Sequence, residues 1–279
     1  MEDPRRTGPE TSTAAPPEDA DERVDPDGSE IAAPPGGLDR VRALDLLSQG
    51  ELEIVGRLVE ASNLNLYCRV TRRDIHGGPD LAAACVYKPT RGEQPLDDFP
   101  DGTLAHREVA AYLVSEATGW DIVPPTVLRE GPLGPGMVQL WIDVDESTQV
   151  VDLIRSGDPA LRRMAVFDAV VNNADRKGGH MLPVAGGHVY GVDHGVCFSP
   201  DPKLRTILWG WRGRRLARHE LAVLTSLQAA MSSDLGEALG ELLAPREVAA
   251  TARRIRRLLG RGTFPQPSPN WPAIPWPPF

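Results

Sequence analysis

The pattern of apolar and polar positions predicts a small sheet in the first half of the chain. The segment GLDRVRALDLLSQG has the spacing of a short amphipathic helix. Three strand-like segments follow it, separated by turn-forming residues: 51–60, 64–73 and 81–89. A helix is expected over 102–119, with Gly119 as its C-cap. Two further strands, 122–130 and 136–143, complete an antiparallel sheet with one helix inserted after its third strand.

The second half of the chain is predicted to be mainly helical. Ser147 and Pro159 are plausible start signals for its first two helices. Helical periodicity is found in five segments: 147–155, 159–173, 216–232, 234–243 and 245–259. One predicted hairpin interrupts these helices.

This hairpin is expected to bring three polar residues together. Its strands flank Ala185-Gly186-Gly187, a short link of the kind that closes hairpins. If the link has three residues, Val184 pairs with His188, and His180 lies opposite Val192. The open end of the hairpin then holds two carboxylates and an imidazole: Asp175, His180 and Asp193.

The two ends of the chain differ in composition from the part between them. Residues 1–37 are rich in Pro, Gly, Ser and acidic groups and are predicted to be disordered. Residues 263–279 carry so many prolines that an extended conformation is expected. Three aromatic residues of this segment are expected to pack against the body: Trp271, Trp276 and Phe279. Between the ends, 38–142 contains the predicted sheet and 143–262 the predicted helices.

The net charge of −9 is concentrated in residues 1–37. They contain ten Asp or Glu and three Arg, which leaves only −2 for the rest of the chain. Because the folded part is near neutral, binding to nucleic acid is not expected.

The sequence contains no sign of a membrane segment or of a cysteine framework. No run of about 18 apolar residues and no signal-peptide core occur, which favours a cytoplasmic protein without a membrane anchor. The three cysteines are scattered and lack a CxxC pair, so we interpret them as small apolar residues: Cys68, Cys85 and Cys197.

Two groups of residues suggest chemistry. The carboxylates and imidazole at the open end of the hairpin can bind a metal or move a proton, although Asp and His also cap turns. Lys88 ends an apolar strand, and Glu108 lies on the helix that follows. A lysine and a glutamate so placed can hold nucleotide phosphates, whereas a plain charge at a strand end is the alternative.

Together these segments resemble the protein-kinase-like fold, and most specifically its phosphatidylinositol 3-/4-kinase-like branch. The resemblance covers about residues 50–230, in the order strand lysine, helix glutamate, catalytic loop and metal motif. NADRKGGH is similar to the D-R-x-x-x-N loop of that branch, and VDHG to its D-x-G motif. The chain is also similar to an actinobacterial family of unassigned substrate that is labelled phosphatidylinositol-kinase-like. The resemblance implies a two-lobed α+β fold, with a small antiparallel-sheet N-lobe containing one helix and a mainly helical C-lobe.

The resemblance also implies an ATP-dependent phosphotransferase that acts on an unidentified hydroxyl-bearing substrate. Asp175 would orient or deprotonate the attacking hydroxyl, and Arg176 would hold the loop. Lys177 would contact the γ-phosphate or the acceptor, or it would be a solvated loop charge; the two interpretations are balanced.

The nucleotide-binding residues are implied in the same way. Lys88 would contact the phosphates, and Glu108 would hold Lys88. Backbone groups of the hinge between the lobes would pair with adenine: Gln139, Leu140 and Trp141. Ser62 and Asn63 would cover the phosphates, although their turn lacks a G-x-G-x-x-G sequence.

The metal site departs from the family pattern at one position. Asp193 would be the main ligand of Mg²⁺, because a hard cation prefers carboxylate oxygen. The pattern has Asn five positions after Asp175, where this chain has His180. An imidazole suits Mg²⁺ poorly, so His180 points to Mn²⁺, to a contact through water, or to impaired transfer.

Three other functions stay open from the sequence. A nucleotide-binding pseudokinase that regulates through its tails would explain His180 and the missing glycine-rich loop. Nucleotidyl transfer would need ATP in the reverse pose. A metallohydrolase would hold a transition metal with four residues: Asp175, His180, His188 and Asp193.

Neighbouring polar residues receive structural interpretations. Asp168 either anchors the catalytic loop or forms the polar face of its helix, and the second is favoured. Asn172 and Asn173 are expected to satisfy backbone groups of the loop. His188 and His194 are assigned ordinary hydrogen bonds rather than a metal. The basic run RGRRLARHE is interpreted as a solvated helix surface.

Overall fold

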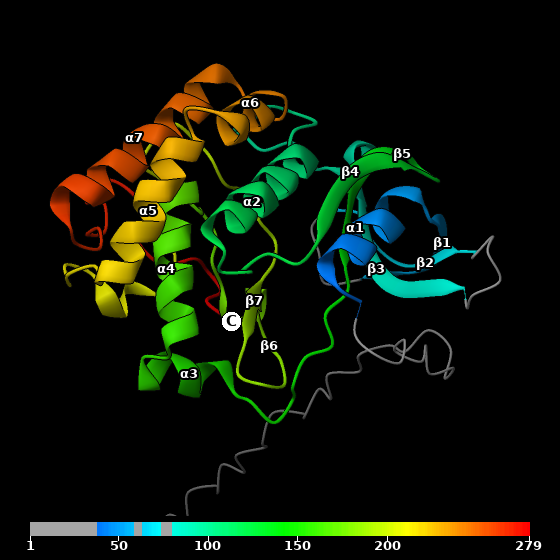
Figure 1. Cartoon of the computed structure of the whole chain (residues 1–279), viewed down its shortest axis with the longest axis horizontal. Coiled ribbons are helices and arrows are strands. Elements are labelled where there is room, and N and C mark those ends of the chain that lie inside the picture. Colours follow the sequence, from blue (N-terminus) through cyan, green and yellow to red (C-terminus); the bar gives the residue numbers. More distant parts are fainter. Residues whose placement is uncertain (1–37, 59–62, 74–79) are drawn as a thin grey trace, which may run out of the picture. The chain divides into compact units, whose positions relative to one another are not determined.

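The computed structural model describes residues 38–58, 63–73 and 80–279 of the chain (Figure 1). The segment predicted to be disordered, 1–37, and the candidate phosphate-covering Ser62 lie outside these residues. None of the helices within the described ranges is long and apolar enough to cross a membrane.

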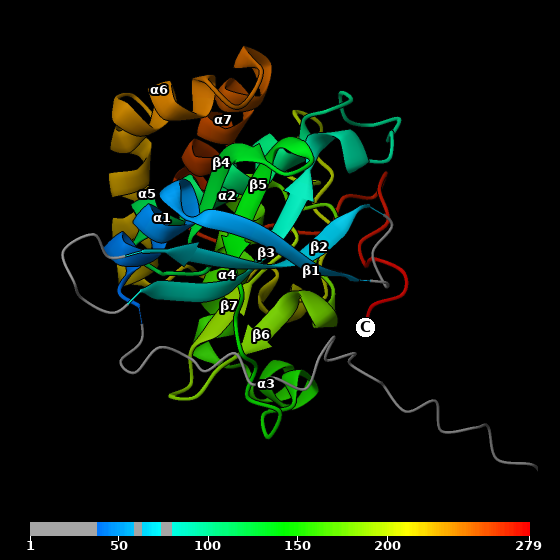
Figure 2. The same ribbon diagram turned by 90° about the vertical axis from the view of Figure 1, so that its right-hand side faces the viewer.

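A five-stranded antiparallel sheet forms the first part of the structure (Figure 2). Its strand order is β1-β2-β3-β5-β4. The strands fall within or close to the predicted segments: β1 Glu51–Leu58, β2 Asn65–Arg72, β3 Leu81–Pro89, β4 Thr126–Gly131 and β5 Gly134–Leu140. Side chains alternate between the two faces of β3, so Cys85 and Tyr87 are buried on one face and Lys88 points to the other.

The first helix covers the face of the sheet to which Cys85 and Tyr87 point. Helix α1, Arg40–Gln49, begins at Asp39, whose carboxylate accepts a hydrogen bond from the Arg42 amide at 2.9 Å. Leu46 and Leu47 of α1 belong to the same buried cluster as those two β3 side chains. The strand lysine is thus directed away from this small core.

Helix α2, Leu104–Thr118, joins the sheet to the helices of the second half. Ala105 and Val109 pack against Met137 of β5, while other buried residues of α2 share the large core with α4, α5 and α7. The first amides of α2 are capped by a residue from the preceding loop. The carboxylate of Glu93 accepts hydrogen bonds from the amides of Leu104 and Ala105 at 3.0 and 2.8 Å.

The second part is helical with one short hairpin, so the predicted α+β class is confirmed. The helices are α3 Val150–Ser156, α4 Pro159–Val171, α5 Arg218–Ala230, α6 Asp234–Gly240 and α7 Pro245–Arg261. The hairpin consists of β6, Met181–Pro183, and β7, Val189–Gly191. Its predicted register is confirmed: the Val184 amide donates to His188 O at 2.9 Å, and the Val192 amide to His180 O at 3.0 Å.

Two local expectations are wrong, and one holds. Helix α3 begins at Val150, because Ser147 donates its hydroxyl to Asp145 in the preceding turn instead of capping the helix. Trp276 is 86% exposed, whereas Trp271 and Phe279 do contact the body. The three cysteines are free and buried, as expected of small apolar residues.

A buried ion pair fixes α2 against the second part. Arg107 is only 1% exposed, and its Nη2 lies 2.7 Å from Glu247 Oε1 of α7. Its Nη1 also donates to the carbonyl of Cys197 at 2.8 Å. A buried guanidinium needs such partners, because an unpaired charge in the interior is costly.

We expect Arg107→Met to lower the free energy of unfolding by about 3–5 kcal/mol, because it leaves Glu247 buried without its partner. The double variant Arg107→Met/Glu247→Met should lose less, since no charge is left unpaired. Urea unfolding of both variants, with the exposed Arg256→Met as matched control, measures the difference. A cost for Arg107→Met no larger than that of the control would contradict the role given to the pair.

Candidate active site

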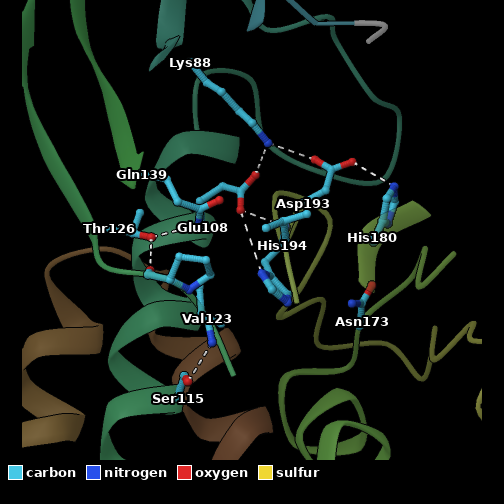
Figure 3. A network of polar contacts seen from close by, with 12 residues as sticks. Lys88, Glu108, Ser115, Val123, Thr126, Gln139, Asn173, His180, Asp193 and His194 are labelled. Atoms are coloured by element: carbon cyan, nitrogen blue, oxygen red, sulfur yellow. Dashed lines mark hydrogen bonds and ion pairs between the residues drawn. The ribbon is translucent and has the colours of Figure 1, made fainter. Parts of the chain in front are cut away.

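Lys88, Glu108 and Asp193 meet at one ion-pair cluster (Figure 3). The Nζ of Lys88 lies 2.6 Å from Glu108 Oε1 and 3.0 Å from Asp193 Oδ1. Glu108 is buried, whereas the side chain of Asp193 is 51% exposed. One ammonium therefore holds an inner carboxylate of α2 and an outer carboxylate from the turn after β7.

The three charges support one another. Burial alone would lower the pKa of Lys88, but the charges of Asp193 and Glu108 outweigh it and raise that pKa. The Lys88 charge holds the pKa of Asp193 far below its usual range, so this carboxylate is ionised. Burial raises the pKa of Glu108, and Lys88 opposes that effect.

The turn that carries Asp193 has an unusual backbone. Asp193 has a φ of 62°, in the left-handed region that residues other than glycine seldom adopt. The amide of the next residue, His194, donates to Glu108 Oε2 at 2.8 Å. Glu108 thus contacts Lys88 with one oxygen and the turn with the other, and a strained backbone position at such a place is typical of a functional site.

A second ion pair lies buried beneath the loop of residues 173–180. Arg176 and Asp168 have fully buried side chains, and Arg176 Nη2 lies 2.9 Å from Asp168 Oδ1. Nη1 of Arg176 donates to the carbonyls of His180 and Val192, at 3.1 and 3.2 Å. Asp168 therefore anchors this loop. The interpretation favoured from the sequence, that Asp168 belongs to the solvated polar face of its helix, is wrong, because α4 turns this side chain into the interior.

His194 connects the two ion-pair clusters. Its Nε2 lies 2.6 Å from Arg176 Nη2, and since a guanidinium can only donate, the imidazole nitrogen must accept. Burial, together with the charge of Arg176, holds the pKa of His194 well below its ordinary value. A neutral His194 thus links the turn of Asp193 to Arg176.

The two asparagines after α4 shape the loop, in line with their expected structural role. Asn172 has a φ of 57° and ends the helix, and its side-chain amide donates to Ser199 O and Asp201 O at 2.9 and 2.6 Å. Asn173 accepts from the Asp175 amide at 2.9 Å and donates to Asp168 at 3.1 Å.

Asp175 lies between two cations. Its Oδ2 is 3.1 Å from Lys177 Nζ, and its Oδ1 is 3.2 Å from Arg205 Nη2. Lys177 is therefore paired within the site, and is not simply a solvated loop charge. The sequence offered no sign of Arg205, which lies 30 residues further along the chain.

His180 contacts the outer carboxylate of the cluster. Its Nε2 is 3.3 Å from Asp193 Oδ2, and its Nδ1 is buried without a hydrogen-bond partner among the described residues. Burial lowers the pKa of His180. His188 bonds instead to the carbonyl of Asp121 at 2.8 Å, and no group of three or more His, Cys, Asp or Glu in the described ranges could hold a metal.

A cavity of about 490 Å³ opens in front of these residues. Its walls come from β3, α2, the segments that carry Asp175 and Asp193, the loop 93–99 and the C-terminal segment. They include Asn63, Lys88, Asp175, Asp193 and Trp271. Asn63 uses its side-chain oxygen to accept the Gln94 amide at 2.7 Å, so it fixes the loop at the cavity edge.

The three candidate hinge residues lie outside this cavity wall and are engaged in the sheet. The Leu140 amide donates to Pro125 O at 2.9 Å, and the Trp141 amide to Ala84 O at 3.0 Å. The buried Gln139 donates its side-chain amide to Thr126 Oγ1 at 2.8 Å (Figure 3). The N–H groups of Leu140 and Trp141 are therefore already used within the sheet, and the pairing of backbone groups of these three residues with adenine stays a prediction.

Comparison with known proteins identifies the family. Protein Rv2133c of Mycobacterium tuberculosis (strain ATCC 25618 / H37Rv) is 42% identical over 271 residues, which cover 84% of this chain and 94% of that protein. The chain belongs to the Rv2133c family. No family model matches it. A solved structure of the Helicobacter pylori proinflammatory kinase CtkA is similar to this member of the Rv2133c family, with a TM-score of 0.40 and 13% identity over 76% of this chain and 98% of the other.

Sequence reasoning missed several residues of this Rv2133c-family site. Arg205, Lys203 and Trp271 line the cavity, and Glu93 caps the helix that carries Glu108. None of them lies in a motif or follows a period. Of these residues, the sequence indicated only Trp271, as an aromatic residue expected to pack against the body.

We expect Asp168→Asn to destabilise the protein by about 3–5 kcal/mol, because it removes one partner of a fully buried ion pair. Asp152→Asn, an exposed acid on α3, should change stability by no more than about 0.5 kcal/mol. Thermal or urea unfolding of the two variants gives the comparison. Equal stability of both variants would show that Asp168 does not anchor the loop.

Proposed function

We propose that this protein is an ATP-dependent phosphotransferase with a kinase-like site. The single observation that carries the proposal is the position of Lys88, which contacts Glu108 and Asp193 at once. A lysine held by a helix glutamate beside an exposed aspartate is the arrangement that phosphoryl-transfer sites use to hold a triphosphate and its metal.

The residues fit a divalent cation at Asp193. Its carboxylate is half exposed and ionised and lines the cavity, and hard cations prefer such oxygen ligands. Mg²⁺ or Mn²⁺, when bound, would neutralise charge on the phosphate oxygens. His180, with Nε2 beside Asp193, would be the second ligand, and an imidazole suits Mn²⁺ better than Mg²⁺.

Asp175 is proposed to orient the acceptor. Its two oxygens contact Lys177 and Arg205, which hold the carboxylate in place to accept the hydrogen bond of an incoming hydroxyl. In the transfer step, the acceptor oxygen bonds to the γ-phosphorus while the bond from that phosphorus to the bridging oxygen breaks. ADP leaves with the electron pair of that bond, and Asp175 takes up the hydroxyl proton. Lys177, whose Nζ lies 3.1 Å from Asp175 Oδ2, would contact the transferred group.

Adenine is proposed to pair one step beyond the predicted hinge residues. Ile142, Asp143 and Val144 follow β5 outside any strand. No hydrogen bond between described residues engages their N–H groups. They therefore offer the free donors that Leu140 and Trp141 lack.

A nucleotide-binding pseudokinase is the second candidate, and one observation favours it. His180 stands where the loop of the phosphatidylinositol 3-/4-kinase-like branch has asparagine, and it contacts the aspartate expected to hold the metal. A metallohydrolase is less well supported, because His188 bonds away from the site. Nucleotidyl transfer would use the same residues and would differ in releasing pyrophosphate instead of ADP.

We expect Lys88→Met and Asp193→Asn to lower the rate of ADP formation by at least about 100-fold, as loss of a charge-stabilising group does in enzyme sites. Arg256→Met and Asp234→Asn, both exposed and outside the site, are the matched controls and should retain the rate. The measurement is ADP release in the presence of Mg²⁺ or Mn²⁺, with AMP followed in parallel. Wild-type turnover in Lys88→Met would reject the phosphotransferase.

We expect His180→Asn to shift the metal preference of turnover from Mn²⁺ towards Mg²⁺ by about tenfold, because it exchanges an imidazole for an amide oxygen. The ratio of rates in the two metals measures the shift, and His219→Asn is the exposed control. A wild-type protein that binds ATP but has no turnover with either metal, and gains none from this substitution, would be a pseudokinase.

A further inference from the structure

The C-terminal segment returns to the loop that carries Asp175. The carbonyl of Pro278 accepts a hydrogen bond from the Gly178 amide at 2.8 Å. The carbonyl of Ala273 accepts two, from the Thr206 amide at 3.0 Å and from Trp209 Nε1 at 2.8 Å. This proline-rich segment is therefore hydrogen-bonded to the loop that carries Asp175, at Gly178, and to the segment that follows Arg205, at Thr206 and Trp209.

The position of the Phe279 ring requires a glycine at position 178, in the loop that carries Asp175. A Cβ at position 178 would overlap the ring of Phe279. Gly178 is not among the glycines with positive φ, so its backbone does not require glycine. Its lack of a side chain thus serves the contact with Phe279.

Trp271 forms a wall of the cavity beside Asp175. Lys203 Nζ and Arg205 Cζ lie 4.8 and 5.9 Å from its ring centroid, within the range of cation–π contacts. Arg205 also contacts Asp175, and Lys203 pairs with Asp98 across the cavity at 2.5 Å. The indole is thereby tied to the candidate catalytic aspartate and to the opposite loop.

We propose that residues 271–279 are part of the phosphoryl-acceptor site, where Trp271 admits only small hydroxyl compounds. The inference rests on the proposed function and concerns its acceptor. The cavity of about 490 Å³ is lined by Lys88 and Asp193 as well as by Trp271, so the triphosphate and the acceptor would share one space within the range of small-molecule sites, about 300–1,000 Å³. An acceptor on a polypeptide would have to displace Trp271, which is held by two cations and by the hydrogen bonds of Ala273.

The first experiment tests, without any ligand, whether the segment 271–279 is docked against the loop that carries Asp175. Amide hydrogen exchange at Thr206 is compared in wild type, Gly178→Ala, Phe279→Ala and the double variant. Gly178→Ala should expel Phe279 and speed exchange at Thr206 at least about tenfold. The double variant removes the overlap and should exchange more slowly than Gly178→Ala. Unchanged exchange in Gly178→Ala would overturn the docking of the segment.

The second experiment measures acceptor choice with Trp271→Ala and the conservative Trp271→Phe. The probes are water, glycerol, D-glucose and dephosphorylated casein, each with ATP and Mn²⁺. Trp271→Ala should raise phosphoryl transfer to water or casein at least about threefold, leave the Kd of ATP unchanged and lower selectivity for the small alcohols. Trp271→Phe should restore the wild-type pattern, because it restores an aromatic wall.

The outcomes separate the two proposals. A wild-type protein that neither binds nor turns over ATP removes the proposed function and, with it, the acceptor site. If wild type turns over ATP but Trp271→Ala has the wild-type pattern with all four probes, only the proposed role of Trp271 in acceptor choice is rejected. A weaker Kd for ATP in Trp271→Ala would also reject it, since Trp271 would then belong to the nucleotide side.

Discussion

The sharing of one ammonium between two carboxylates is the constraint on which the site depends. Lys88 comes from β3, Glu108 from α2 and Asp193 from the turn after β7, so three elements far apart in the sequence meet at one Nζ atom. The buried Glu108 could not remain charged without this partner, and the exposed Asp193 keeps its second oxygen free of Lys88. The geometry therefore separates a structural carboxylate from one available to a ligand.

An unbroken chain of contacts connects this cluster to Asp175. Glu108 accepts from the His194 amide, the His194 ring accepts from Arg176, and Arg176 pairs with Asp168. Asn173 extends the series to Asp175, because its side chain donates to Asp168 and accepts from the Asp175 amide. Because the buried side chains in this series are hydrogen-bonded to one another, a movement of Lys88 relative to Asp175 would break at least one of these bonds.

Local pattern was enough to predict the elements and part of the site. Counting outward from the Gly-containing link placed His180 opposite Val192, because a hairpin register follows from its turn. The apolar run that ends at Lys88 indicated its strand, but the burial pattern of β3 in the structure was needed to show that Lys88 points away from the small core. The inward direction of Asp168 could not be predicted, since an acid within an apolar helix fits either face until its partner is known. Trp271 and Arg205 could not be predicted as site residues either, because they reach Asp175 through contacts that no period encodes.

The anchoring of α2 bears on how such a site can be controlled. Glu93 caps the first turn of the helix, Arg107 forms a buried pair with Glu247, and the residues between pack into the large core. Moving α2 to break the contact of Lys88 with Glu108 would have to break the Arg107 pair as well, at a cost of about 3–5 kcal/mol. The C-terminal segment is held by a few hydrogen bonds and by the contacts of Trp271 with Lys203 and Arg205, and its departure would break none of the buried ion pairs described above. Moving the C-terminal segment, and with it one wall of the proposed acceptor site, therefore costs less free energy than separating Lys88 from Glu108.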